Sequence, residues 1–285
     1  MLGKLMKYEW RGLRFPLLIM LGVLGVATLL TCILIFTINP KYDSVASGLS
    51  VLSLILSIML YYFGIIGCSV GTMLIIAIRF YKTTYTDQGY LTHTLPVETK
   101  TLLAAKTITS VLCYLLMLLG IAATLLIIIG AIYTHICNLS AYEGVYLDQH
   151  IGELFAELSD GFREEYGISF GAFVTFYTVF MIVACISAIM TVLGCVSLGQ
   201  LYTKHRIIGA IIAYFAVISV QQFISYLAML PTYSRMIRAE ALSETIPMFE
   251  IISPTMIISL LWAVAVSIIM HIINLHMMTK RLNLE

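Results

Sequence analysis

The chain has 285 residues, of which 60% are hydrophobic and only 11% are Asp, Glu, Lys or Arg. A soluble domain is roughly half apolar and about a quarter charged, so this composition excludes an ordinary soluble protein and indicates an integral membrane protein. The formal net charge of +1 and the lack of a basic run exclude a nucleic-acid-binding surface built on charge.

The N-terminal residues 1–14, MLGKLMKYEWRGLR, predict an amphipathic helix at the membrane surface. With about 100° between successive residues, the basic side chains share one face and the apolar ones, with Trp10 as an interfacial anchor, share the other. Glu9 is an exception on the apolar side. The alternative is an ordinary basic flank of the first membrane span.

Six segments without Asp, Glu, Lys or Arg follow, and each is long enough to cross a lipid bilayer, for which about 20 helical residues suffice. They are residues 15–38, 49–78, 107–136, 168–201, 207–230 and 251–278. The expected fold class is therefore an all-α integral membrane protein, with one six-span transmembrane domain over residues 15–285. Within the second segment, Gly64, Gly67 and Gly71 have the spacing of small residues that allows close helix packing.

The distribution of Lys and Arg predicts the orientation, because positive residues collect on the cytoplasmic side. With a cytoplasmic N-terminus, only Lys41, Arg163, Arg235 and Arg238 of the sixteen Lys and Arg residues lie outside. Both termini and the loop 79–106 are then cytoplasmic in a multi-pass protein of the cell membrane. An acidic insertion, 138–167, with amphipathic helical spacing, and a shorter loop, 231–250, are external.

Motifs for catalysis or metal binding are missing from the sequence. There is no phosphate-binding G-x-x-x-x-G-K-[ST] motif, and the six cysteines lack zinc-site spacing. We expect no catalytic residue, no metal and no cofactor bound by this chain. His271 and Asn274 on the last span could line a proton path, but their place in its last turns favours simple interfacial positions.

The most informative polar stretch is YTDQGYLTHTLPVETKTLLAAK, residues 85–106. Thr86 or Asp87 can cap a short helix that the Leu95-Pro96 pair ends, and Thr99 can cap the helix leading into the third span. A short helix across the cytoplasmic face, joined to two spans, is suited to receive a push from a soluble partner.

This stretch resembles the first cytoplasmic loop of permease subunits of bacterial type-2 ABC exporters, which commonly show Gly-Tyr-Leu followed by Leu-Pro-Val and a Lys. MLGKLMKYEWR is similar to their N-terminal interfacial helix, and SLGQLYTKHRIIGAIIAYF is similar to their second cytoplasmic turn. That turn contains Gln200, Lys204, His205 and Arg206.

The resemblance implies a permease without its own motor. Two six-span subunits, identical or homologous, would pair in the lipid bilayer, and each would dock a separate ABC ATP-binding subunit that binds ATP and magnesium. Residues 87–95 would form the coupling helix seated in a groove of that ATPase. The implied coupling residues are Asp87, Gln88, Gly89, Tyr90, Leu91, Thr92, Leu95, Pro96 and Glu98.

The two acids Asp87 and Glu98 would pair with basic groups of the ATPase, while Tyr90, Leu91 and Leu95 would fill its groove. The cargo would be hydrophobic or amphipathic: a drug, a peptide or a lipid. Two other classes of function stay open. One is a membrane scaffold or sensor that signals through the acidic insertion without transport, and the other is a membrane-embedded enzyme.

Overall fold

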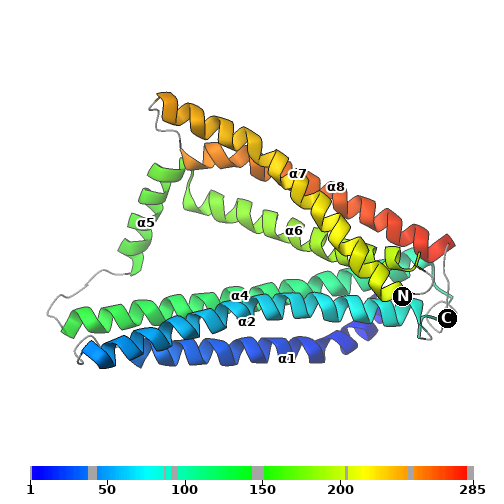
Figure 1. Ribbon diagram of the computed structural model, residues 1–285, viewed down its shortest axis with the longest axis horizontal. Coiled ribbons are helices and arrows are strands. Elements are labelled where there is room, and N and C mark those ends of the chain that lie inside the picture. The colour runs from blue at the N-terminus through cyan, green and yellow to red at the C-terminus, as the bar shows by residue number, and fades with distance from the viewer. Residues whose placement is uncertain are drawn as a thin grey trace. The chain divides into compact units, whose positions relative to one another are not determined.

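The computed structural model describes residues 2–37, 44–86, 88–90, 96–142, 151–202, 205–242 and 247–280. Its long elements are all helices (Figure 1). They are α1 (Leu2–Thr37), α2 (Ser44–Tyr85), α4 (Thr99–Tyr142), α5 (Ile151–Tyr166), α6 (Phe170–Gly199), α7 (Arg206–Leu242) and α8 (Met248–Lys280). All except α5 are long and apolar enough to cross a membrane, so the predicted all-α class with six such helices is confirmed for the described residues.

The helices are longer than the apolar segments that predicted them. Helix α1 is continuous from Leu2 to Thr37, so residues 1–14 are not a separate helix from the first span. Pro16 lies inside α1. Helix α7 likewise continues through Pro231 to Leu242, which makes the first part of the expected external loop helical. Hydropathy ends a segment at the first polar residues, whereas a helix continues through Arg, Lys and Glu because these residues favour helix.

The same extension shortens the predicted loop 79–106. Helix α2 ends at Tyr85 and α4 begins at Thr99, so only residues 86–98 connect them, and residues 88–90 of this connection are helical. We call residues 86–98 the connecting segment. Asp87, Leu91, Thr92 and Leu95 lie outside the described residues.

The chain divides into two compact units, of which the first contains residues 1–78 and 108–148. In this unit α1 packs together with residues 44–78 of α2 and residues 108–142 of α4. The Thr31 hydroxyl of α1 donates to the Ser57 carbonyl of α2 at 3.4 Å, and the Tyr61 and Thr124 hydroxyls join α2 to α4 at 2.9 Å. Such side-chain bonds suit helices in lipid, where the contact between two apolar surfaces releases no water.

The glycines of α2 differ in what they meet. A Cβ built on Gly64 would lie 3.8 Å from Ala27 Cβ of α1, and one on Gly71 would lie 3.1 Å from Met20 Cε. A Cβ on Gly67 would meet no described atom within 4 Å outside its own helix neighbourhood. Within the first unit, Gly64 and Gly71 therefore face α1, whereas Gly67 makes no such close contact.

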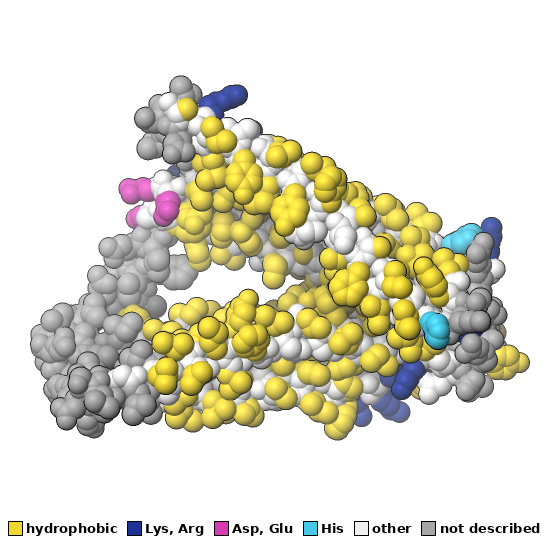
Figure 2. All heavy atoms as spheres, in the orientation of Figure 1, with side chains coloured by type: hydrophobic (Ala, Val, Ile, Leu, Met, Phe, Trp, Pro, Cys, Tyr) yellow, Lys and Arg dark blue, Asp and Glu magenta, His cyan; other side chains and the backbone are white. Residues whose placement is uncertain are grey.

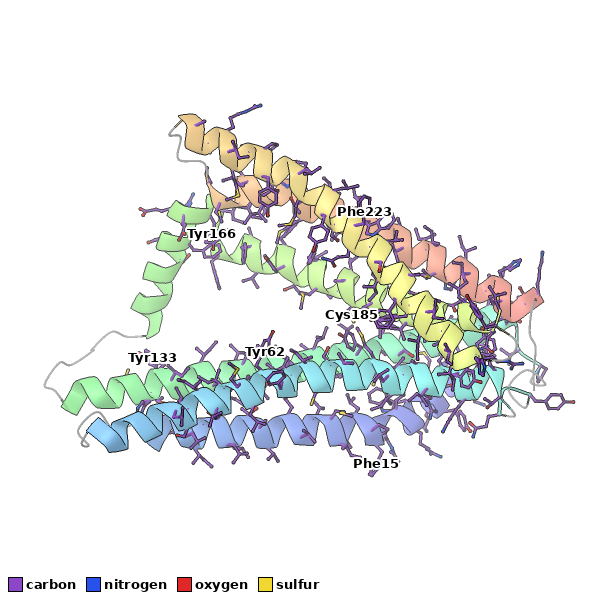
Figure 3. All side chains as sticks on the ribbon, viewed as in Figure 1. Phe15, Tyr62, Tyr133, Tyr166, Cys185 and Phe223 are labelled. Carbon is purple, nitrogen blue, oxygen red and sulfur yellow. The ribbon has the colours of Figure 1, made fainter. Side chains whose placement is uncertain are left out.

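The second unit contains residues 79–107 and 149–285. In it α6, α7 and α8 pack against one another, and α5 contacts α6 and α8. The buried residues of α6 lie in its C-terminal half, from Cys185 to Gly199 (Cys185 is labelled in Figure 3). The end of α6 is thus the buried part of this helix, and it lies close to α8 and to the start of α7.

Helix α5 is held by aromatic contacts around its C-terminal end. The Phe162 ring stacks on Tyr166 at 4.2 Å and meets Phe173 of α6 edge-on at 4.8 Å between centroids. The turn into α6 uses Gly167, whose φ of 74° lies in the left-handed region that favours glycine. A Cβ there would also lie 2.7 Å from Pro247 Cβ, so both conformation and space favour glycine.

The outer faces of the long helices are hydrophobic. Figure 2 shows hydrophobic side chains spread over these helices, with acidic side chains gathered at the α5 end of the second unit. Large apolar residues such as Leu126 on α4 and Phe223 on α7 (labelled in Figure 3) are exposed. So much exposed apolar surface fits a bilayer as the surrounding solvent.

Candidate functional site

The connecting segment is held against the end of α2 by local backbone contacts. The Gly89 N–H donates to the Thr86 carbonyl at 2.6 Å, which starts the helical turn at 88–90. The Thr86 hydroxyl donates back to the Lys82 carbonyl at 2.6 Å. Thr86 therefore contributes its carbonyl to the new turn, while its hydroxyl stays on α2 instead of capping the short helix.

Gly89 allows this segment to lie directly on α2. A Cβ at position 89 would be 2.4 Å from the Thr84 carbonyl oxygen and 2.6 Å from its carbon. Both are backbone atoms in the last turn of a helix, so they cannot rotate aside as a flexible side chain could. Glycine at position 89 therefore permits the contact between the segment and α2.

Among the other described residues of the segment, Val97 is half-buried and the rest are exposed. Gln88, Tyr90, Pro96 and Glu98 are exposed, and Tyr90 retains 62% of its accessible surface. The Glu98 carbonyl accepts the N–H groups of Thr101 and Leu102 at 2.9 and 3.1 Å. Glu98 therefore occupies the position before the first turn of α4, where Thr99 was expected, and Thr99 is already helical.

A buried lysine joins the two helices that flank the connecting segment. Lys106 of α4 is almost fully buried, and its Nζ donates to the Thr83 carbonyl of α2 at 3.3 Å and, in a short contact, to the Thr83 hydroxyl. A charged amine near a membrane span needs such oxygen partners, because burial without them is costly. The bond fixes the end of α2 to the start of α4.

A second set of buried polar groups joins α2 to α6 and α8. Tyr85 is the last residue of α2, and its hydroxyl donates to Ser197 Oγ of α6 at 2.8 Å. The Ser197 hydroxyl in turn donates to Asn274 Oδ1 of α8 at 2.5 Å. Tyr85 is 1% exposed, and Ser197 and Asn274 are fully buried. We call these three residues the polar chain.

Asn274 is fully buried within the protein, which its place near the end of the span did not predict. The structure places it inside the packing of the second unit, with its Oδ1 hydrogen-bonded and its Nδ2 without a partner among the described residues. The buried Gln200 Oε1 and Thr84 Oγ1 also lack partners there. His271 is half-buried, and its Nδ1 has no hydrogen-bond partner among the described residues.

The turn between α6 and α7 contains the other predicted site residues. Gln200 is buried and its side-chain amide donates to the Val196 carbonyl at 3.3 Å, Arg206 is also buried, and His205 is exposed. Lys204 lies outside the described residues. The resemblance placed these residues together in one cytoplasmic turn. Of the three described side chains, those of Gln200 and Arg206 are buried and only that of His205 is exposed.

No cluster of three or more His, Cys, Asp or Glu suited to a metal occurs among the residues that the structure describes. No disulfide joins the cysteines in the part of the chain that the structure describes. The contacts at the end of α2 join this helix to α4, α6 and α8. Comparison of the chain with known protein families, curated proteins and solved structures finds no match.

Sequence reasoning did not single out Tyr85, Ser197 or Lys106 as functional residues. Tyr85 and Ser197 are common residue types separated by 112 positions, so no local pattern relates them. The available signal was Asn274, because an amide within an apolar span is expensive and usually has a partner.

Proposed function

We propose that this chain is the permease subunit of an ABC exporter that moves a hydrophobic or amphipathic cargo across the bacterial cell membrane. The observation that carries the proposal is the connecting segment. It is seated on α2 through Gly89 and exposes Gln88, Tyr90 and Glu98. The resemblance of residues 85–106 to the first loop of such permeases supports the same conclusion.

The proposed mechanism separates the source of energy from the pathway. A separate ATP-binding subunit binds ATP and magnesium, and the connecting segment docks in its groove. Movement of that subunit pushes the segment and, through it, the ends of α2 and α4, which Lys106 and Thr83 hold together. A second six-span subunit, identical or homologous, completes the path for the cargo.

The first test concerns ATP hydrolysis. The purified chain is expected to show no ATPase activity by itself, since its sequence has no phosphate-binding loop. After reconstitution with a separate ABC ATP-binding subunit from the same organism, hydrolysis should be stimulated above that of the ATPase alone. Lack of any association with this ATPase, in lipid and with ATP and magnesium present, would contradict the proposal and favour a scaffold or sensor.

The second test concerns orientation, which the proposal requires to be cytoplasmic for the connecting segment. In a variant without native cysteines, Gln88→Cys should resist a membrane-impermeant thiol reagent in intact cells and react after permeabilisation. Gly161→Cys on α5 should react in intact cells, and it serves as the matched exposed position. Rapid labelling of Gln88→Cys in intact cells would reverse the orientation.

A further inference from the structure

The polar chain connects the segment proposed to receive a push with two of the long helices. We propose that Tyr85, Ser197 and Asn274 transmit a displacement of the connecting segment to α6 and α8. The purpose of this link in transport rests on the proposed function. The mechanical link itself is a property of this chain alone and can be tested without any partner.

The first step of the path is the contact between the segment and α2. Gly89 lies so close to the Thr84 carbonyl that no side chain fits between them. Thr84 directly precedes Tyr85 in the last turn of the helix. A displacement of the 88–90 turn toward α2 must therefore move the backbone that carries the Tyr85 ring, because two backbones already in contact cannot be compressed further.

The second step is the bond from Tyr85 to α6. The ring is buried, meets Phe80 edge-on at 6.1 Å between centroids, and directs its hydroxyl to Ser197 Oγ. The packed ring has little freedom to rotate away. Since the bond is shielded from water, no water molecule can readily replace Ser197 as the acceptor, so the bond persists when α2 moves slightly.

The third step joins α6 to α8. One turn before Ser197, a Cβ on Gly194 would lie 2.6 Å from Met270 Sδ, so the two helices approach closely at this level. Met270 lies one turn before Asn274 on α8. This close approach holds Ser197 Oγ and Asn274 Oδ1 at bonding distance, and Ser197 becomes the common partner of α2 and α8.

Asn274 gives the polar chain the ability to change partners. Its Nδ2 carries N–H donors with no acceptor among the described residues, while Gln200 Oε1, one turn after Ser197 on α6, lacks a donor there. A buried donor without an acceptor raises the energy of the arrangement in which it occurs. A shift of α6 against α8 that supplies a partner is therefore favoured over one that only separates apolar side chains.

The test uses the purified chain alone in lipid nanodiscs, with amide hydrogen exchange as the readout. Gly89→Ala introduces the displacement, because its new methyl group presses on the Thr84 carbonyl and must force the segment and the end of α2 apart. We expect exchange in residues 270–280 of α8 to rise about fivefold, as when one buried hydrogen bond is lost. In a Ser197→Ala background, Gly89→Ala should add no further increase, and Tyr85→Phe should block the transmission in the same way.

Ser187→Ala is the matched control, because Ser187 is a buried serine of the same helix outside the polar chain. In that background the fivefold response to Gly89→Ala should persist. An equal response with and without the Ser197 hydroxyl would overturn the proposal, since the displacement would then bypass the polar chain. No response of α8 to Gly89→Ala in the otherwise unaltered chain would overturn it as well.

A second experiment separates this inference from the proposed function. With the ABC ATP-binding subunit and a non-hydrolysable ATP analogue, docking should protect the connecting segment in the unaltered chain, Tyr85→Phe and Ser197→Ala alike. The nucleotide-dependent change in α8 exchange should occur only in the unaltered chain. Absence of docking would contradict the permease function. The proposed transmission through the polar chain would then be decided by the hydrogen-exchange experiment on the purified chain alone. A change in α8 that both variants retain would contradict the link.

Discussion

Tyr90→Ala is expected to weaken binding of the partner ATPase about 30-fold, the equivalent of about 2 kcal/mol for an aromatic anchor at an interface. Tyr90 is 62% exposed in the chain by itself, so its removal should leave insertion and folding intact. The measurement is a titrated pull-down of the ATPase by the detergent-solubilised chain, alongside ATPase stimulation in proteoliposomes. Leu91→Ala is expected to act in the same direction.

Tyr8→Ala is the matched control for this experiment, because Tyr8 on α1 is similarly exposed, at 68%, and lies outside the connecting segment. Asp87→Ala should have a smaller effect that salt reduces further, since a charge at the rim of an interface contributes mainly to association rate. His271→Ala should leave docking unchanged. Wild-type docking and stimulation in both Tyr90→Ala and Leu91→Ala would show that this segment is only a connection.

Gly199→Ala is expected to destabilise the chain by about 2 kcal/mol, within the range for added atoms in a packed interior. A Cβ at this position would lie 2.6 Å from the Ala210 nitrogen and 2.7 Å from the Arg206 carbonyl oxygen. Both atoms belong to the first turns of α7, so relief requires that α7 move away from the end of α6. The measurement is the thermal unfolding midpoint in one detergent, with binding of a thiol-reactive dye to the buried cysteines as the probe.

Gly22→Ala on α1 provides the contrast, because a Cβ there meets nothing within 4 Å among the described residues. In an open helical position, alanine should be neutral or stabilise by about 0.5–1 kcal/mol. Equal midpoints for Gly199→Ala and Gly22→Ala would mean that the turn between α6 and α7 is looser than its contacts indicate.

Together these variants distinguish docking of a partner from packing between helices. Loss of ATPase binding in Tyr90→Ala with normal stability would identify an exposed docking surface. Loss of stability in Gly199→Ala would report on the packing between α6 and α7. Ser197 has neither of these roles, because it is buried in α6 and is hydrogen-bonded to Tyr85 of α2 and Asn274 of α8. Its substitution should therefore preserve docking and abolish the response of α8.

The sequence by itself determined the class of protein and the existence of its six long helices. Hydropathy has this power because every backbone N–H and C=O in lipid must be bonded within the segment, so an uncharged apolar run of sufficient length becomes a helix. It placed the ends less well. Residues 79–85 read as a loop because Arg79 and Lys82 are charged, yet nothing in them breaks a helix, and α2 continues to Tyr85.

The polar contacts at the candidate site were decided only by the tertiary structure. Gly89 could be read as a turn residue, but its requirement comes from Thr84, five positions earlier, once the chain has folded back. The sequence predicted an interfacial position for Asn274 from its place near the end of the span. It did not predict that the side chain is buried, because hydropathy along one helix contains no information about which neighbouring helix covers a residue. Ser197 becomes the partner of Asn274, and Tyr85 becomes the partner of Ser197, because three helix ends meet, and that meeting depends on contacts between residues far apart in the chain.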